Sequence, residues 1–172
     1  VDLSAMYTRR PDVLKRAFAL VPEYLVTSHD DVVNLMDYGV QLGRRFRALK
    51  LWMVIRAFGV NGIMARLREH MALAQELAAW VRGATGWEVA APVHFSLVCV
   101  RYAPPGTSEA ERERLNSQIM ERVNASGRVF VSHTKLEGTY VIRIAIGNVR
   151  TGHEHVAEAW RLLQSAAAEV RT

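Results

Sequence analysis

Apolar residues in the segment 41–59 recur at helical spacing along two stripes of a helix rather than one. The first stripe follows steps of three and four residues and the second lies beside it: Leu42, Phe46, Leu49, Met53 and Ala57, then Leu51, Ile55 and Phe58. Two apolar stripes predict burial on two sides. Arginines crowd the N-terminal end of this segment, so a buried helix there needs carboxylates, carbonyls or a bound anion as their partners. The simpler alternative is a core helix whose arginines form structural ion pairs.

The chain on either side of this segment predicts two further helices and one long loop. Residues 1–7 read as a short strand, and Pro11 begins a helix that continues to Leu20. No period is recognisable in residues 23–39, and a loop of that length in a compact protein is usually a lid, a binding loop or a connection. We expect Gly59 to end the helix of 41–58 and Asn61 to cap another helix that reaches about Val81. The predicted buried stripe of that helix is Ile63, Leu67, Ala74, Ala78 and Val81.

The pattern from Trp87 onward predicts a small α+β layer. The expected order is strand 87–90, strand 95–102, a helix from the capping box of Ser108 and Glu111 to about Gly127, strand 129–135, strand 140–146 and a final helix ending near Val170. Glu137-Gly138 between two apolar runs indicates a hairpin. We therefore expect an antiparallel sheet with helices packed on one side.

Composition narrows the class of protein. The chain has 172 residues, half of them apolar, and a net charge of +5, which is enough for a hydrophobic core. Its basic residues are mainly arginine and are spread along the chain, which argues against a nucleic-acid partner. No apolar run approaches the ~20 residues of a membrane span and no signal peptide is recognisable, so we expect a cytoplasmic protein without a membrane partner. Cys99 lies in an apolar run, where a packed thiol is expected rather than a nucleophile.

The residues alone indicate little self-contained chemistry. His153 and His155 stand two residues apart, whereas a helical metal pair needs a spacing of three or four, so we expect no metal. Neither a glycine-rich phosphate loop nor a nucleophile elbow is present. Bottom-up, the chain is an α/β piece with a lid-like loop and a basic helix.

Three motifs together resemble one family. Pro22-Glu23-Tyr24-Leu25, the run LGRRFRALKLW at 42–52 and Ile142-Arg143-Ile144-Ala145-Ile146 resemble the C-terminal portion of the pyridoxal-phosphate-dependent group II amino-acid decarboxylases. The resemblance covers essentially the whole chain and is strongest to the aromatic-L-amino-acid (DOPA, tyrosine, tryptophan) decarboxylases.

This resemblance implies the fold class α/β, as the C-terminal part of an aspartate-aminotransferase-like (fold type I) enzyme. Residues 1–59 would end the large domain, with a mobile catalytic loop at about 22–40, and residues 60–172 would form the small α+β domain. It also implies the cofactor pyridoxal 5'-phosphate. The Schiff-base lysine of the family lies upstream of the stretch that residues 1–7 resemble, so no cofactor-binding residue is expected in this chain. The implied partners are the N-terminal cofactor-binding part of the same enzyme, a second copy in a homodimer and an aromatic L-amino acid.

The resemblance also assigns roles to single residues. Tyr24 matches a tyrosine on a mobile loop that returns a proton to the substrate after CO2 has left, where related aldehyde synthases carry Phe. Gly43 matches a pocket position that is Ser in histidine decarboxylases, and its missing side chain leaves room for an aromatic ring. Leu42 and Arg44 would line or brace this pocket, although Arg44 is equally explained by a structural ion pair. His29 would be an accessory polar group on the loop.

One departure from the family bears on the substrate. Only Gly39-Val40-Gln41 separate Tyr38 from Leu42, where the animal enzymes have a longer segment with a tryptophan and a proline.

Two hypotheses remain open at this point. The chain is either part of a decarboxylase that is inactive by itself, or a non-enzymatic α+β ligand-binding or regulatory module. The first hypothesis predicts large exposed apolar surfaces on the isolated chain, and the second does not.

Overall fold

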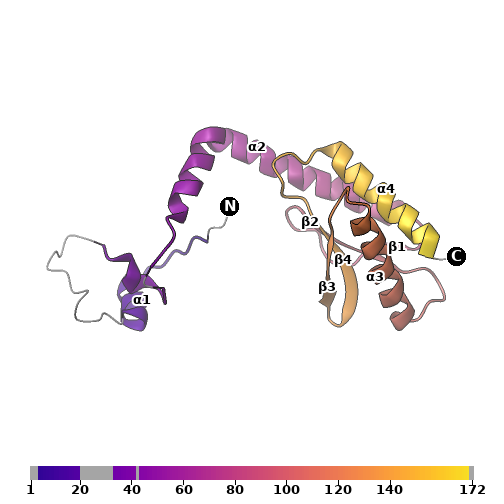
Figure 1. Ribbon diagram of the computed structural model, residues 1–172, viewed down its shortest axis with the longest axis horizontal. Coiled ribbons are helices and arrows are strands. Elements are labelled where there is room, and N and C mark those ends of the chain that lie inside the picture. The colour runs from indigo at the N-terminus through magenta and orange to yellow at the C-terminus, as the bar shows by residue number, and fades with distance from the viewer. Residues whose placement is uncertain (1–3, 20–32, 42, 171–172) are drawn as a thin grey trace. The chain divides into compact units, whose positions relative to one another are not determined.

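The computed structural model describes residues 4–19, 33–41 and 43–170 (Figure 1). The chain divides into two compact units, Val1–Val60 and Asn61–Thr172. This boundary lies one residue from the boundary expected at Gly59, whereas the assignment of the units to a large and a small domain stays a prediction.

The first unit contains little regular structure apart from α2. Helix α1 spans Pro11–Phe18, and η2 is a short 3-10 helix over Leu35–Tyr38. The ammonium group of Lys15 lies 5.2 Å from the centroid of the Tyr38 ring, a cation–π contact that joins α1 to η2. The expected opening strand is wrong for residues 4–7, because no described strand pairs with them and a strand needs such a partner.

Helix α2 spans Arg47–Gly83 and is interrupted at one residue. Gly59 has φ 67° and ψ 170°, a conformation that only glycine adopts readily, so residues before and after it form separate helical stretches, as the sequence predicts. The expected start at Gln41 is wrong, because the helix begins at Arg47. Gly43 disfavours helix, and the N–H of Arg47 donates to the carbonyl of Arg45 (2.7 Å) in a tight turn that precedes the regular pattern.

The first stretch of α2 carries its apolar side chains on the surface of this chain, contrary to the expected burial on two sides. The exposed residues at its start and along it are Phe46, Leu49, Leu51, Trp52, Met53, Ile55 and Phe58. Trp52 is 57% exposed, with the Arg56 guanidinium 5.8 Å from its ring centroid. An apolar helix of this kind is normally covered by other polypeptide. The helix therefore meets the expectation of the decarboxylase hypothesis rather than that of the independent module.

By length and composition alone, α2 is also long and apolar enough to cross a membrane. This finding corrects the expectation that no such segment exists in the chain. It is weak evidence for a membrane span, because core helices of water-soluble proteins in general pass the same test. The non-helical residue at Gly59 also interrupts the backbone hydrogen bonding that a span requires.

The second unit is built on a four-stranded antiparallel sheet, as predicted. Its strands are β1 (Trp87–Val89), β2 (Leu97–Tyr102), β3 (Ser132–Leu136) and β4 (Thr139–Ala145), and their order in the sheet is β1-β2-β4-β3. The hairpin of β3 and β4 turns at Glu137 and Gly138, whose positive φ angles of 49° and 84° suit a two-residue hairpin loop. Strand β2 begins two residues later than expected, because Phe95 has a left-handed φ of 52° and is exposed.

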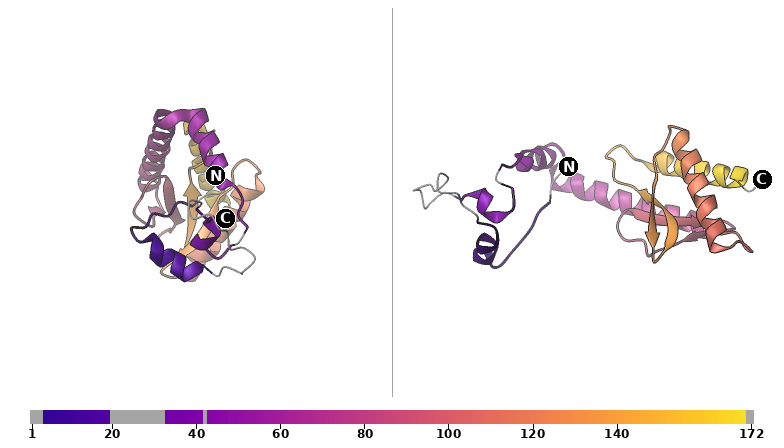
Figure 2. Two further views of the ribbon diagram at one scale, coloured as in Figure 1. Left: turned by 90° about the vertical axis from the view of Figure 1, so that its left-hand side faces the viewer. Right: turned by 60° about the horizontal axis from the view of Figure 1, so that its bottom comes forward.

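Helices cover one face of this sheet (Figures 1 and 2). They are α3 (Glu109–Ala125), α4 (His153–Val170) and the second stretch of α2. The alternate residues of β2 and β4 that face them are Val98, Val100, Tyr102, Tyr140, Ile142 and Ile144. They share one apolar core with Leu77 of α2, Ile119 of α3 and Leu163 of α4. The predicted stripe of α2 is correct at Ala74, Ala78 and Val81 but wrong at Leu67, which is 57% exposed.

Two asparagines of α3 connect this helix to the backbone of other elements. Asn116 is fully buried: its Oδ1 accepts from the N–H of Tyr102 (2.8 Å), and its Nδ2 donates to the Tyr102 carbonyl (2.8 Å). Asn124 makes the same pair of bonds with Val131, at 2.8 and 2.9 Å. Since unpaired backbone groups are costly to bury, these amides stabilise the ends of β2 and the approach to β3.

The contrast between Leu77 and Leu67 gives a test of this core. We expect Leu77→Ala to lower the free energy of unfolding of the second unit by about 2–5 kcal/mol, because it leaves a cavity among fully buried neighbours. Leu67→Ala on the same helix should change it by about 0.5 kcal/mol or less. Urea unfolding followed by circular dichroism measures both, and similar losses for the two variants would contradict the described core.

Candidate functional site

A cavity of about 570 Å³ lies within the first unit, between η2 and the N-terminal end of α2. Its lining residues are Ser4, Leu35, Arg44, Arg45, Phe46, Arg47 and Ala48. The late start of α2 creates this cavity, because residues 43–46 remain extended or bent and leave their side chains at the helix end. Leu35 and Phe46 supply apolar wall, and the arginines supply the polar groups.

The charged side chains that line the cavity are all positive. Three of its seven lining residues are arginines, and none is acidic. The first turn of α2 also contains no acidic residue to balance the partial positive charge of a helix N-terminus. Among the described residues, Arg44 and Arg45 form no ion pair. The cavity therefore suits an oxyanion or the carboxylate of another polypeptide segment, as the sequence analysis anticipates for these arginines.

Two glycines beside the cavity have opposite surroundings. A methyl group added at Gly39 would overlap Nη2 of Arg44 and stand 3.5 Å from its Cζ. A methyl group added at Gly43 would meet nothing within 4 Å. Gly39 is extended, with φ 179° and ψ 172°, which any residue adopts. Gly39 therefore leaves space for the Arg44 guanidinium and is not needed for its backbone conformation, whereas Gly43 adjoins open volume.

The structure describes two of the five residues predicted to form a site. Arg44 lines the cavity, and Gly43 directly precedes it in the chain without lining it. Tyr24, His29 and Leu42 lie outside the described residues. The crowding of arginines in the segment 41–59 predicts that Arg45 and Arg47 need partners but assigns them no role, and no sequence signal points to Ser4 or Leu35.

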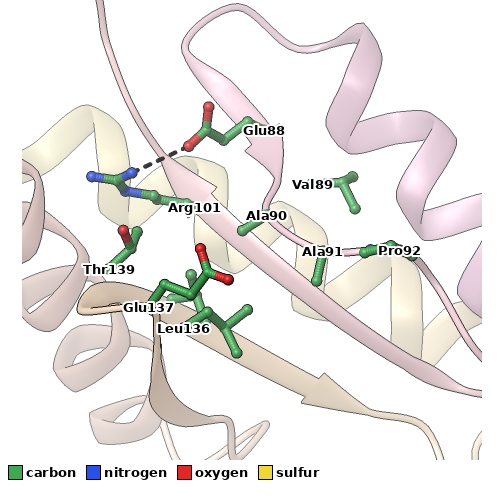
Figure 3. A pocket seen from close by; sticks show the side chains of 10 residues that line it. Glu88, Val89, Ala90, Ala91, Pro92, Arg101, Leu136, Glu137 and Thr139 are labelled. Carbon is green, nitrogen blue, oxygen red and sulfur yellow. Dashed lines mark hydrogen bonds and ion pairs between the residues drawn. The ribbon is translucent and has the colours of Figure 1, made fainter.

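A second cavity, of about 660 Å³, lies in the second unit on the sheet face that the helices leave open (Figure 3). Arg101 of β2, Glu88 of β1 and Glu137 of the hairpin are its charged residues. The buried Arg101 guanidinium donates to Glu88 (3.4 Å) and to Glu109 at the start of α3. The hydrogen bond from Arg101 holds the pKa of Glu109 below its usual value. This arginine joins two strands and a helix, a structural role that the sequence analysis missed.

The two histidines of the final helix serve as polar partners of nearby carboxylates. Nε2 of His153 lies 3.2 Å from Oε1 of Glu76, and Nδ1 of His155 lies 3.0 Å from Oε1 of Glu154. Across the described part of the chain, no group of three or more His, Cys, Asp or Glu side chains is arranged to hold a metal ion.

The lysines of the chain do not form a cofactor site. Lys15 packs on Tyr38, Lys50 is exposed on α2, and Lys135 pairs with Glu113 at 2.7 Å. None of the three lines either cavity. A lysine that forms a Schiff base needs a pocket that holds the cofactor against it, so the described residues do not fit such a role.

Comparison with known proteins identifies the family. The model of the pyridoxal-dependent decarboxylase conserved domain matches residues 1–103. Tyrosine decarboxylase 2 of Narcissus pseudonarcissus is 39% identical over 169 residues, which are 96% of this chain and 34% of that protein. Phenylacetaldehyde synthase of Arabidopsis thaliana is 38% identical over 97% of this chain and 35% of its own length.

The solved structures agree with these sequence relatives. The crystal structure of Oryza sativa TDC with PLP and tryptamine matches with a TM-score of 0.79 and 35% identity, over 92% of this chain and 34% of that chain. The chain belongs to the pyridoxal-dependent decarboxylase family and has the α/β fold of fold type I enzymes. It spans about a third of the length of the curated relatives it matches.

Cys99 lies on the open face of the sheet, and the reactivity of its thiol shows whether it is packed or available as a nucleophile. The thiol is buried, and its burial raises its pKa, an effect that the nearby Arg143 opposes only in part. A raised pKa means less thiolate at pH 8 in the folded chain than in the unfolded chain. We expect iodoacetamide to modify Cys99 at least ~10-fold more slowly in the folded chain than in urea.

The matched control moves the thiol to the surface. In the double variant Cys99→Ser, Ser165→Cys, the only thiol stands at an exposed position of α4. This thiol should react at nearly the same rate with and without urea. Equal rates for Cys99 in the folded and unfolded chain would show that it is accessible and not packed.

Proposed function

We propose that this chain is the C-terminal portion of a pyridoxal-phosphate-dependent decarboxylase that converts an aromatic L-amino acid to its amine and CO2. The observation that carries the proposal is the match of nearly the entire chain to decarboxylases named for tyrosine and tryptophan. The run LGRRFRALKLW lies inside the residues that the family model matches. The Schiff-base lysine of the full enzyme lies upstream of this chain.

The exposed apolar surface of α2 supports the enzyme rather than an independent module. The stretch from Leu49 to Phe58 exposes leucine, tryptophan, methionine, isoleucine and phenylalanine side chains. A patch of that kind on a small protein marks an interaction surface. The partner of this surface is the N-terminal cofactor-binding part of the same enzyme, and the complete enzyme is a cytoplasmic homodimer without nucleic-acid or membrane partners.

The cofactor is pyridoxal 5'-phosphate, held by the part of the enzyme outside this chain. The family is pyridoxal-dependent, and the related rice enzyme is solved with PLP. In this proposal the chain supplies residues around the substrate, and the Schiff-base lysine belongs to the part of the enzyme outside this chain.

Five residues have proposed roles towards the substrate. The phenol of Tyr24 donates a proton to Cα after CO2 has left. His29 is an accessory polar group on the same loop. Gly43 leaves space for the aromatic ring, and Leu42 and Arg44 line or brace this pocket. The open space beside Gly43 supports its role, since no described atom lies within 4 Å of an added methyl group.

The relatives include an aldehyde synthase, so the reaction outcome has to be distinguished. The product of a decarboxylase is an amine, and that of the Arabidopsis relative, by its name, is phenylacetaldehyde. The tyrosine at position 24 favours the amine, because a phenol placed at Cα completes the reaction by protonation.

A hybrid enzyme tests the proposed function. The first two-thirds of the Narcissus tyrosine decarboxylase, joined to this chain, should bind the cofactor with an absorption band near ~420 nm and release CO2 and amine from an aromatic amino acid. In this hybrid we expect Tyr24→Phe to lower amine formation by about 100-fold or more, with aldehyde appearing instead, because the proton donor is lost.

Tyr7→Phe is the matched control, because Tyr7 is 95% exposed in the described chain and has no proposed role. It should leave amine formation unchanged. A hybrid that binds the cofactor but releases no CO2 would refute the proposed function, and unchanged amine formation by Tyr24→Phe would refute the role of Tyr24.

A further inference from the structure

The side chain of Arg44 lies close against the backbone at Gly39. Only four residues separate the two positions. The side chain of Arg44 reaches back to the backbone at Gly39. Nη2 of Arg44 occupies the volume that a Cβ at Gly39 would need.

If Gly39 were replaced by alanine, the steric overlap would displace the Arg44 guanidinium and not the backbone. Gly39 is extended, so alanine would fit its backbone conformation without strain. The atom in the way is the end of a long flexible side chain that is itself exposed. A methyl group at position 39 would thus displace the Arg44 guanidinium at little cost to folding.

The position of that guanidinium matters to the cavity. Arg44, Arg45 and Arg47 all line it, and Arg44 forms no ion pair among the described residues. Moving one of three positive charges changes both the volume and the local potential of a cavity of about 570 Å³. The free space at Gly39 therefore determines where the positive charge of the Arg44 guanidinium lies relative to the cavity.

We propose that Gly39 is a positioning residue, which lets the Arg44 guanidinium lie against the backbone and so sets the shape and charge of the substrate side of the pocket. The effect on the substrate rests on the proposed function, because Arg44 braces the pocket beside Gly43. The contact itself does not depend on any activity. An Arg44 held in place contributes equally to binding before and during the reaction, so its displacement acts on KM rather than on kcat.

The first experiment uses the 172-residue chain alone. In ¹⁵N NMR spectra of the arginine side chains, the Nε–H signal of Arg44 is identified by its loss in Arg44→Ala. Gly39→Ala should shift this signal, whereas Val40→Ala should not, because Val40 is 89% exposed and adjoins the same glycine. An unchanged Arg44 signal in Gly39→Ala would overturn the proposal.

The second experiment is a double-mutant cycle in the hybrid enzyme. Gly39→Ala should raise KM for the aromatic amino acid by about 3–10-fold and change kcat by less than about 2-fold, since only uniform binding is lost. In the Arg44→Ala background the same substitution should have no further effect, because no guanidinium remains to be displaced. A Gly39→Ala effect of the same size in both backgrounds, or one on kcat alone, would show a general structural defect and overturn the proposal.

The two experiments separate this proposal from the proposed function. If the hybrid binds the cofactor and releases no CO2, the proposed function fails, while the NMR comparison still decides whether Gly39 positions Arg44. If the hybrid is active and the two substitutions are not coupled, the proposed function stands and the role of Gly39 fails.

Discussion

The structure of both units depends on Gly59, the residue that separates the exposed first stretch of α2 from its buried second stretch. Before Gly59 the helix carries apolar side chains that are exposed in this chain. From His70 onward, side chains of the same helix are buried in the second unit. A φ of 67° with ψ of 170° is costly for any residue with a Cβ. Glycine at this position allows one continuous stretch of chain to supply a core helix to the second unit and an apolar surface to the first.

The second unit illustrates how polar groups complete an apolar core. Its helices and sheet bury leucine, isoleucine and valine side chains, which supply the main driving force but little directional information. Asn116, Asn124 and Arg101 supply the direction, because each one bonds α3 to a particular strand or to the segment before it. An apolar core of the same volume would tolerate small shifts of α3 that these bonds do not.

The sequence predicts the second unit well because its periodicities are local. Alternation in β4 and the helical spacing in α3 and α4 are properties of consecutive residues, and the hairpin at Glu137-Gly138 follows from turn chemistry. The predictions are wrong where burial or strand pairing depends on a partner that is distant in the sequence. Leu67 follows the apolar period of α2 yet is 57% exposed, and residues 4–7 pair with no described strand. Asn116 was missed because its partner is a backbone 14 residues away.

The candidate site was predictable in kind but not in geometry. The crowding of arginines at the start of the segment 41–59 predicts that they need partners, and the cavity beside them is lined by three arginines and no acidic residue. It could not predict that α2 starts at Arg47, because helical periodicity alone does not show that Gly43 and the turn at Arg45 keep the preceding residues out of the helix. The contact of Gly39 with Arg44 depends on a side chain that folds back over the backbone, which no periodicity encodes.

The two hydrogen bonds between Asn116 and Tyr102 also affect how fast an amide hydrogen of the sheet exchanges with solvent. The Tyr102 amide at the end of β2 would fray if it faced water, since terminal strand residues open most easily. Here its N–H and its carbonyl are both bonded to one buried side chain, anchored in turn to the carbonyl of Arg112 at 2.8 Å. Hydrogen exchange at this strand end therefore requires α3 to detach, so the last residue of β2 reports on opening of the helix layer rather than on local fraying.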